Sequence, residues 1–198
     1  MRTICLLLGL AASASAQDVV WEPVGTEASW KGTVFAGGFD GELWTLEKDG
    51  SLYKTDRSGE WTRMGEAKAC AGMVAFVSEG HHLWFVDKAG TLHRMSKELE
   101  WDRVGEAGIL DALVGIVAHD HNLWTVHRNG ALYKTSCRSG KVVQIGDAVT
   151  WNDVRAMEFL DGHLWTIEEE GTLYKCDFGG RRTRMGRENE HSDVLLMT

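Results

Sequence analysis

Four short polar loops recur along the chain, and each comes directly before a Leu-Trp pair. Their carboxylate, imidazole and amide groups can hydrogen-bond a polar ligand. We predict that these loops bind a ligand. The alternative is that sequences such as Asp-Gly only form the turns, because they favour tight turns by themselves. The candidate residues are Asp40, Glu42, His81, His82, Asp120, His121, Asn122, Asp161 and His163.

Tryptophans follow these loops and offer a flat apolar surface on which a ligand can stack. Their fixed position within each Leu-Trp pair favours packing between sheets over contact with a ligand. Trp30 and Trp151 occupy another repeated position, at which the other copies hold Cys70, Leu110 and His191. We predict that these two are semi-buried loop anchors. The tryptophans predicted to pack between sheets are Trp44, Trp84, Trp124 and Trp165.

Catalytic and metal-binding chemistry has little support. In the segment His119-Asp120-His121, two alternate side chains on one strand face can share a cation. No third ligand stands at a fixed spacing from them. The chain contains no nucleophile elbow, phosphate-binding loop or zinc-protease motif. No pair of acidic residues stands out as a glycosidase pair. The sequence therefore predicts a protein that is not an enzyme and uses no cofactor or metal.

The candidate loops must be positioned by the strands of an internal repeat. The tryptophans of the Leu-Trp pairs are 40, 40 and 41 residues apart. In the first copy, residues 43–47 alternate between two faces, as in a strand. Asp49-Gly50 then has the composition of a two-residue hairpin turn with positive dihedrals, and residues 52–54 begin the return strand.

Each repeat contains two further strands, one apolar and one that ends in glycine. Four strands in a repeat of this length are typical of a propeller blade. We predict an all-β propeller of four-stranded blades, in the order apolar inner strand, Leu-Trp strand, Leu-Tyr-Lys strand and outer strand. The four predicted blades cover residues 33–65, 72–105, 112–146 and 153–186.

The two ends of the repeat region match single strands of a further blade. Residues 19–25 match an outer strand and residues 193–197 an inner strand, so the sequence predicts four complete repeats and a partial fifth. One hypothesis is a truncated five-bladed propeller, closed by pairing of the N-terminal outer strand with the last blade. The rival hypothesis is a ring of four blades with an overhang at each end.

The first 16 residues predict a secretory signal peptide, followed by a single domain over residues 17–198. Arg2 precedes an apolar stretch, and Ala14-Ser15-Ala16 forms a cleavage site. No other stretch is long and apolar enough to cross a membrane. The predicted protein is therefore secreted and does not insert into membranes. The net charge of −8 argues against nucleic acid as a partner, because the protein and the nucleic acid would both be negatively charged and repel each other.

Three cysteines remain after the predicted signal, namely Cys70, Cys137 and Cys176. An odd number cannot all pair within one chain. Cys137 and Cys176 fall in consecutive repeats, so we expect them on neighbouring sheets. The sequence predicts mostly free thiols and leaves room for one disulfide.

The pattern Leu-Trp-x-hydrophobe, Gly-x-Leu-Tyr-Lys/Arg and Trp-x-x-Val-Gly resembles the tectonin/tachylectin-like propeller repeat. The resemblance covers residues 21–197. Many members of that family are lectins that bind microbial surface glycans in innate defence, and others bind proteins. The resemblance therefore implies a lectin that binds glycans or glycoconjugates multivalently, with weak sites repeated from blade to blade. The alternative is a propeller scaffold that binds a protein partner.

Overall fold

The computed structural model describes residues 30–192, which form β-strands joined by turns and contain no helix. The first two sheets are β1 (Thr33–Phe39), β2 (Glu42–Glu47), β3 (Leu52–Thr55) and β4 (Trp61–Met64), then β5 (Met73–Glu79), β6 (His82–Asp87), β7 (Leu92–Ser96) and β8 (Trp101–Val104). The other two are β9 (Leu113–His119), β10 (Asn122–His127), β11 (Leu132–Ser136) and β12 (Val142–Ile145), then β13 (Val154–Leu160), β14 (His163–Glu168), β15 (Leu173–Cys176) and β16 (Arg182–Met185). Within the same range, no helix is long and apolar enough to span a bilayer.

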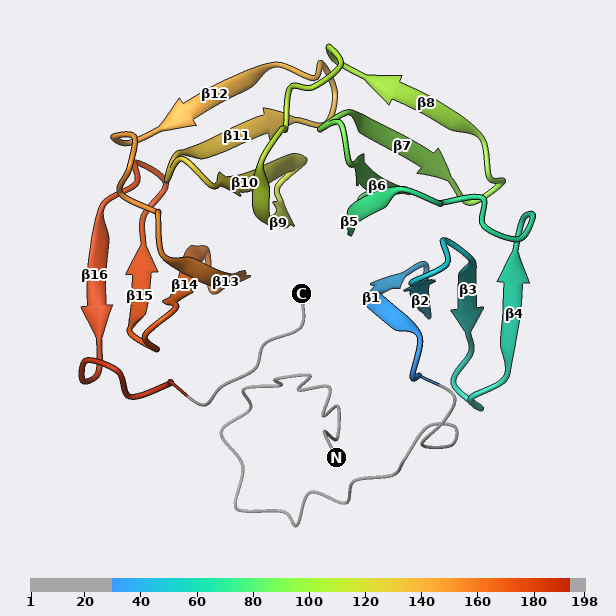
Figure 1. The fold of residues 1–198 in the computed structure, drawn as a ribbon, viewed down its shortest axis with the longest axis horizontal. Helices are drawn as coiled ribbons and strands as arrows, with labels where there is room; N and C mark the ends of the chain where they lie inside the picture. The colour runs from blue at the N-terminus through green and yellow to red at the C-terminus, as the bar shows by residue number, and fades with distance from the viewer. Residues whose placement is uncertain (1–29, 193–198) are drawn as a thin grey trace.

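Each sheet is an antiparallel meander whose strands pair in sequence order. The inner strands β1, β5, β9 and β13 lie near a common centre, and the outer strands form the rim (Figure 1). Successive inner strands pack against one another, β1 with β5, β5 with β9 and β9 with β13. The described chain is thus a β-propeller with four blades, and the predicted order of strands within a blade is confirmed.

The four described blades do not include the predicted fifth blade. Its segments, residues 19–25 and 193–197, lie outside the described residues, as does the predicted signal peptide over residues 1–16. Each described blade lies beside the next one along the chain, but the fourth blade does not lie beside the first (Figure 1).

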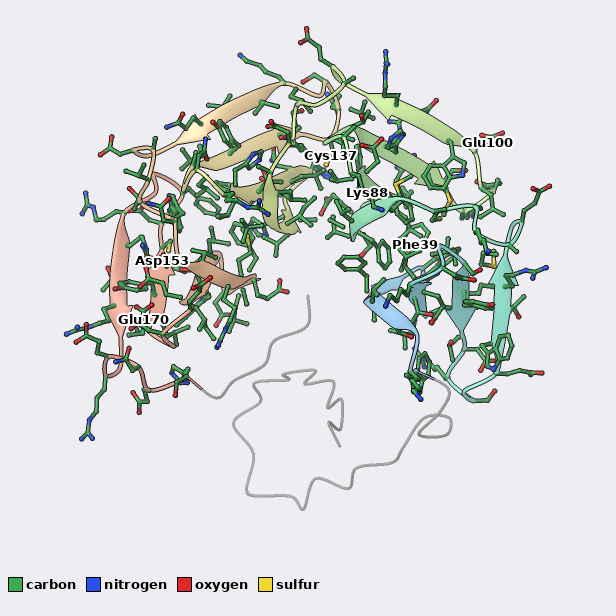
Figure 2. All side chains as sticks on the ribbon, viewed as in Figure 1. Phe39, Lys88, Glu100, Cys137, Asp153 and Glu170 are labelled. Carbon is green, nitrogen blue, oxygen red and sulfur yellow. The ribbon has the colours of Figure 1, made fainter. Side chains whose placement is uncertain are left out.

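The core lies between blades rather than within them, and side chains fill the spaces between neighbouring sheets (Figure 2). Trp44 and Leu46 share one face of β2 and pack against Leu83 and Phe85 of the second blade. Such burial is expected, because a blade has two apolar faces that only its neighbours can cover. Packing of the repeated tryptophans is confirmed for three of the four, since Trp44, Trp84 and Trp124 are 2%, 1% and 2% exposed.

The prediction that Trp151 is a semi-buried loop anchor was wrong, because this side chain is only 1% exposed. The loops after β4, β8 and β12 fold inward, and each inserts one residue between two blades, namely Cys70, Leu110 and Trp151. The backbone N–H of Trp151 donates to the carbonyl of Gly130 at 3.0 Å, and that of Cys70 donates to Gly50 at 2.9 Å. Trp30 at the same repeat position is only partly buried.

The prediction for the Asp49-Gly50 turn was also wrong in detail. Gly50 has a φ of 88°, but Asp49 is not in the left-handed region. The Asp49 carboxylate instead accepts a hydrogen bond from the N–H of Ser51 at 2.9 Å. A Cβ on Gly50 would lie 2.5 Å from the backbone nitrogen of Ala71. Glycine is therefore needed here for its dihedral and for the close approach of the next connecting loop.

All three cysteines in the described range are free, in agreement with the predicted free thiols. Burial raises the pKa of Cys70 and of Cys176 to about 11. Burial, together with the charge of Glu79, raises the pKa of Cys137 to about 12. The thiols therefore stay protonated at neutral pH, and protonated thiols are poor nucleophiles and metal ligands.

A buried histidine predicts that the protein loses stability in acid. His127 is 5% exposed, and its Nε2 lies 3.2 Å from the Thr125 hydroxyl. Burial lowers the pKa of His127 below its ordinary value. The unfolded chain takes up a proton at about pH 6.5, whereas the folded chain keeps this imidazole neutral to lower pH. The free energy of unfolding should therefore fall as the pH drops below about 6.5.

The measurement is urea unfolding at several pH values on both sides of that point, for the wild type and for His127→Gln. The variant should show a shallower loss of stability in acid, because glutamine does not titrate. Identical pH dependence in the two proteins would show that His127 does not cause the acid sensitivity.

Candidate binding site between the third and fourth blades

The four predicted loops are the two-residue connections between each inner strand and the Leu-Trp strand. Asp40 and Gly41 have φ values of 51° and 78°, which is the combination required by a tight hairpin turn. Asp120 and Asp161 both have a φ of 49°. These three aspartates therefore form the turns, as the alternative interpretation of the sequence proposed. Strand direction puts all four loops on one face of the propeller, together with the loops that precede the outer strands.

The remaining predicted residues lie on separate blades. Glu42 forms an ion pair with Lys54 at 3.1 Å, and His81 is exposed. His82 lies beside Trp84, and burial together with the charge of Arg94 lowers its pKa. The structure thus does not gather the nine predicted residues into one site.

Two of the predicted residues, Asp120 and Asn122, do contribute to a hollow between the third and fourth blades. Its volume is about 170 Å³. The third blade supplies most of the lining from β9, β10 and β11, and the fourth blade supplies one side chain from the loop before β16. The lining residues are His119, Asp120, Asn122, Trp124, Lys134 and Phe178.

One wall of this hollow is aromatic. The ring of His119 stacks on Phe159 with centroids 4.3 Å apart and an angle of 12° between the planes. His119 and Phe178 are 5.8 Å apart and inclined by 16°. Phe178 remains 51% exposed, so part of its ring is free to contact a ligand. The wall offers the flat apolar surface that the C–H face of a sugar ring prefers.

The rest of the lining is polar. The Nζ of Lys134 lies 5.4 Å from the centroid of Trp124, its partner across the strand pair. The side-chain amide of Asn122 donates to the backbone carbonyl of Asp120 at 2.5 Å, which fixes the orientation of the amide. The hollow therefore combines an ammonium group, a carboxylate and an amide beside an apolar surface. This combination suits a small polyhydroxylated ligand.

The aromatic wall was not among the residues predicted from the sequence. Phe178 aligns with Arg57, Lys97 and Cys137 in the other repeats, and Phe159 aligns with small residues. Phe159 and Phe178 leave no periodic signal in the sequence, because their residue types differ from those at the same positions of the other repeats. The available signal was the appearance of aromatic side chains at positions that are polar or small elsewhere.

A carboxylate of the second blade stabilises the Asp120-His121 turn, which contributes to the hollow. His121 has a φ of 57°, at a position where the first and fourth blades have glycine. Its backbone N–H donates to the carboxylate of Glu79 in the second blade at 3.0 Å, and its Nδ1 lies 3.2 Å from the same oxygen. These contacts offset the cost of a left-handed conformation in a residue with a Cβ.

Replacing Glu79 with alanine should therefore loosen this loop. Loss of one hydrogen bond to a charged acceptor corresponds to about 1.5–3 kcal/mol when buried and to less at an exposed residue such as His121. We expect exchange of the His121 amide hydrogen to speed up about fivefold, measured by nuclear magnetic resonance. Glu79→Gln is the control, because its amide oxygen still accepts the bond and should keep exchange slow. Unchanged exchange in Glu79→Ala would contradict the role of Glu79.

Among the described residues, no group of three or more His, Cys, Asp or Glu side chains is arranged to hold a metal ion. The pair His119 and His121, which the sequence placed close together, diverges in the structure. His119 stacks on Phe159, whereas His121 points to Glu79.

No protein-family model and no curated protein sequence matches this chain. The structure resembles virginiamycin B lyase from Staphylococcus aureus, with a TM-score of 0.54, 17% identity, and coverage of 74% of this chain and 52% of that one. It also resembles the computationally designed Ika4 protein, with a TM-score of 0.56, 13% identity, and coverage of 84% and 100%. It resembles YCF48 from Cyanidioschyzon merolae as well, with a TM-score of 0.53, 13% identity, and coverage of 75% of this chain and 55% of that one.

These proteins differ in kind, and at such low identities the likeness shows the β-propeller fold alone. The matched part of this chain spans about half the length of the lyase and of YCF48.

Proposed function

We propose that the protein is a lectin that binds one sugar ring in the hollow between the third and fourth blades. The observation that carries this proposal is the exposed ring of Phe178 beside the polar groups of Asp120, Asn122 and Lys134. The volume of about 170 Å³ is smaller than the roughly 300 Å³ at which sites for drug-sized ligands begin. A single ring fits this space, and the rest of a glycan would extend into solvent.

Membership of the tectonin/tachylectin-like family, secretion and a role in recognising microbial surfaces are parts of the same proposal. The repeat motifs and the predicted signal peptide support them. The sequence offers no catalytic motif, so we propose binding without catalysis. Multivalent binding relies on several weak contacts with a repetitive glycan, which raises avidity without new contacts at each site.

The blades are not equivalent, which limits how many similar sites this proposal assigns. At the junction of the second and third blades, Glu79 stands where His119 stands at the next junction, and it contacts His121. Cys137 takes the place of Phe178 there. We therefore assign one sugar site per chain, at the junction of the third and fourth blades. Multivalent binding to a repetitive glycan then requires several chains.

The test is a glycan array screened with the full chain, run beside a pull-down for protein partners. We expect retention of one class of glycan, and loss of that retention in Phe178→Ala. Absence of any bound sugar at millimolar concentration, together with recovery of a stable protein partner, would overturn the proposal.

A protein-binding scaffold is the second candidate function. The outer strands β4, β8, β12 and β16 are the edges of their sheets, and edge strands present unpaired backbone groups that can pair with an extended peptide. Trp101 and Val143 on these strands are 37% and 47% exposed. These observations favour a peptide that adds a strand to the rim, which the pull-down would detect.

We also propose that the chain continues into a fifth blade after Ser192. The N–H of His191 donates to the carbonyl of Gly171 at 3.0 Å. The same bond precedes β5, β9 and β13, where Cys70, Leu110 and Trp151 donate to the glycine of the preceding hairpin. This agreement supports the sequence prediction that residues 193–197 form an inner strand.

A further inference from the structure

The first blade carries a larger hollow on the face that points away from the second blade. Its volume is about 640 Å³. Trp44 and Leu46 of β2 pack toward the second blade, so the alternate residue Thr45 lies on the opposite face. The hollow is lined by Trp30, Gly32, Thr45, Glu47, Lys48, Asp49, Tyr53, Thr55, Gly59 and Trp61.

The corresponding face of the second blade is a packing surface. Phe85 and Met95 stand at the positions of Thr45 and Thr55, and both belong to the core between the first and second blades. Trp101, at the position of Trp61, is 37% exposed, whereas Trp61 is 61% exposed. The hollow is therefore a surface that, in the second blade, the preceding blade covers.

A specific contact recurs where one blade covers the next. The glycine that follows each of β4, β8 and β12 rests on the loop before the outer strand of the following blade. A Cβ on Gly65 would lie 3.4 Å from Leu99, and one on Gly146 would lie 3.7 Å from Gly180. A Cβ on Gly140 would lie 3.1 Å from the nitrogen of Gly105.

Gly59 is the residue of the first blade that corresponds to Leu99, Gly140 and Gly180, and it lines the hollow. The repeat also identifies its partner. Gly65 stands five residues before Cys70, and Gly25 stands five residues before Trp30. The chain enters the hollow at Trp30, so the preceding residues are within reach of Gly59.

We propose that the segment Trp21–Gly25 of this chain docks on the hollow of the first blade, as β4 docks beside the second blade. Gly25 would rest on Gly59, and Val24 would take the position of Met64, which packs against the core between the first two blades. The segment supplies apolar side chains for a hollow bordered by Trp30, Tyr53 and Trp61. The hollow is then an internal packing site, distinct from the proposed sugar site.

The test is hydrogen–deuterium exchange of the full chain followed by mass spectrometry. We expect the amides of Trp21–Gly25 to exchange on the order of tenfold more slowly than in a free peptide of residues 17–29. Val24→Asp should remove this protection and should also speed exchange in the loop of residues 56–60. Glu22→Lys is the matched control, because the corresponding Thr62 is exposed, and it should leave both regions unchanged.

Exchange of Trp21–Gly25 as fast as in the free peptide would overturn the proposal. Protection that disappears on dilution would also overturn it, since this result would assign the hollow to a second copy of the chain. The measurement on the wild type stands even if Val24→Asp fails to fold. It is also independent of the glycan array, so a failure of one proposal leaves the other open to its own test.

Discussion

Replacement of Trp124 with alanine is expected to lower the free energy of unfolding by about 3–5 kcal/mol. Trp124 is 2% exposed and belongs to the core between the third and fourth blades, with Val117, Leu164 and Met157. Its removal leaves a cavity between two sheets that strand pairing holds in place, so the site cannot collapse freely. Urea unfolding followed by circular dichroism measures the loss.

Trp165→Ala is the matched control. Trp165 stands at the same repeat position and lies under Lys175, as Trp124 lies under Lys134. It faces away from the third blade and is only partly buried. Its replacement should therefore cost clearly less than that of Trp124. A loss from Trp124→Ala well below about 3 kcal/mol would contradict the conclusion that contacts between blades provide the core. Equal losses from the two replacements would instead indicate that the proposed fifth blade covers Trp165.

Phe178→Ala is expected to weaken glycan binding about fivefold to tenfold while changing stability little. Aromatic contacts contribute about 0.5–1.5 kcal/mol beyond the area that they bury, and 1.4 kcal/mol corresponds to a tenfold change in affinity. Phe178 is 51% exposed, so its removal opens no closed cavity. Calorimetric titration with a glycan selected on the array measures the change.

Leu160→Ala is the control for this prediction. Leu160 is 53% exposed and ends β13 on the same blade, but it does not line the hollow. Its replacement should leave the affinity unchanged. A similar loss in both variants, or no loss in Phe178→Ala, would show that the sugar does not stack on Phe178.

Repetition explains why the fold was accessible from the sequence. The Leu-Trp pairs mark one strand of every blade, and the spacing between Trp44 and Trp84 predicts a unit of four strands. Each pair also predicts a buried tryptophan side chain, because a tryptophan that recurs at one strand position is expected to pack against a neighbouring blade on that face. Trp165 is partly exposed because no described blade covers its face, although its local sequence is the same.

Details that depend on contacts between repeats were not accessible. Trp151 was misjudged because the sequence does not show that its loop folds inward between two blades. The Asp49-Gly50 turn was misjudged because Asp49 caps the turn with its side chain, while the two-residue turn lies at Asp40-Gly41. The first error comes from applying a local rule where another blade decides the geometry, and the second from a local side-chain contact that replaces the expected backbone dihedrals.

The candidate site was accessible only in part, for a related reason. Asp120 and Asn122 belong to the repeated loop and were found through it. Phe178 and Phe159 come from the next blade, at positions where the other repeats lack an aromatic ring. A site between blades combines one part that follows the repeat with another that departs from it, and only the first part leaves a periodic signal.

A crystal structure of the protein soaked with a saccharide selected on the array tests the proposed function most directly. The expected result is one sugar ring between the third and fourth blades, with its C–H face against Phe178 and its hydroxyls within hydrogen-bonding distance of Asp120, Asn122 or Lys134. A sugar bound instead at the hollow of the first blade, near Trp61 and Tyr53, would contradict the proposed site.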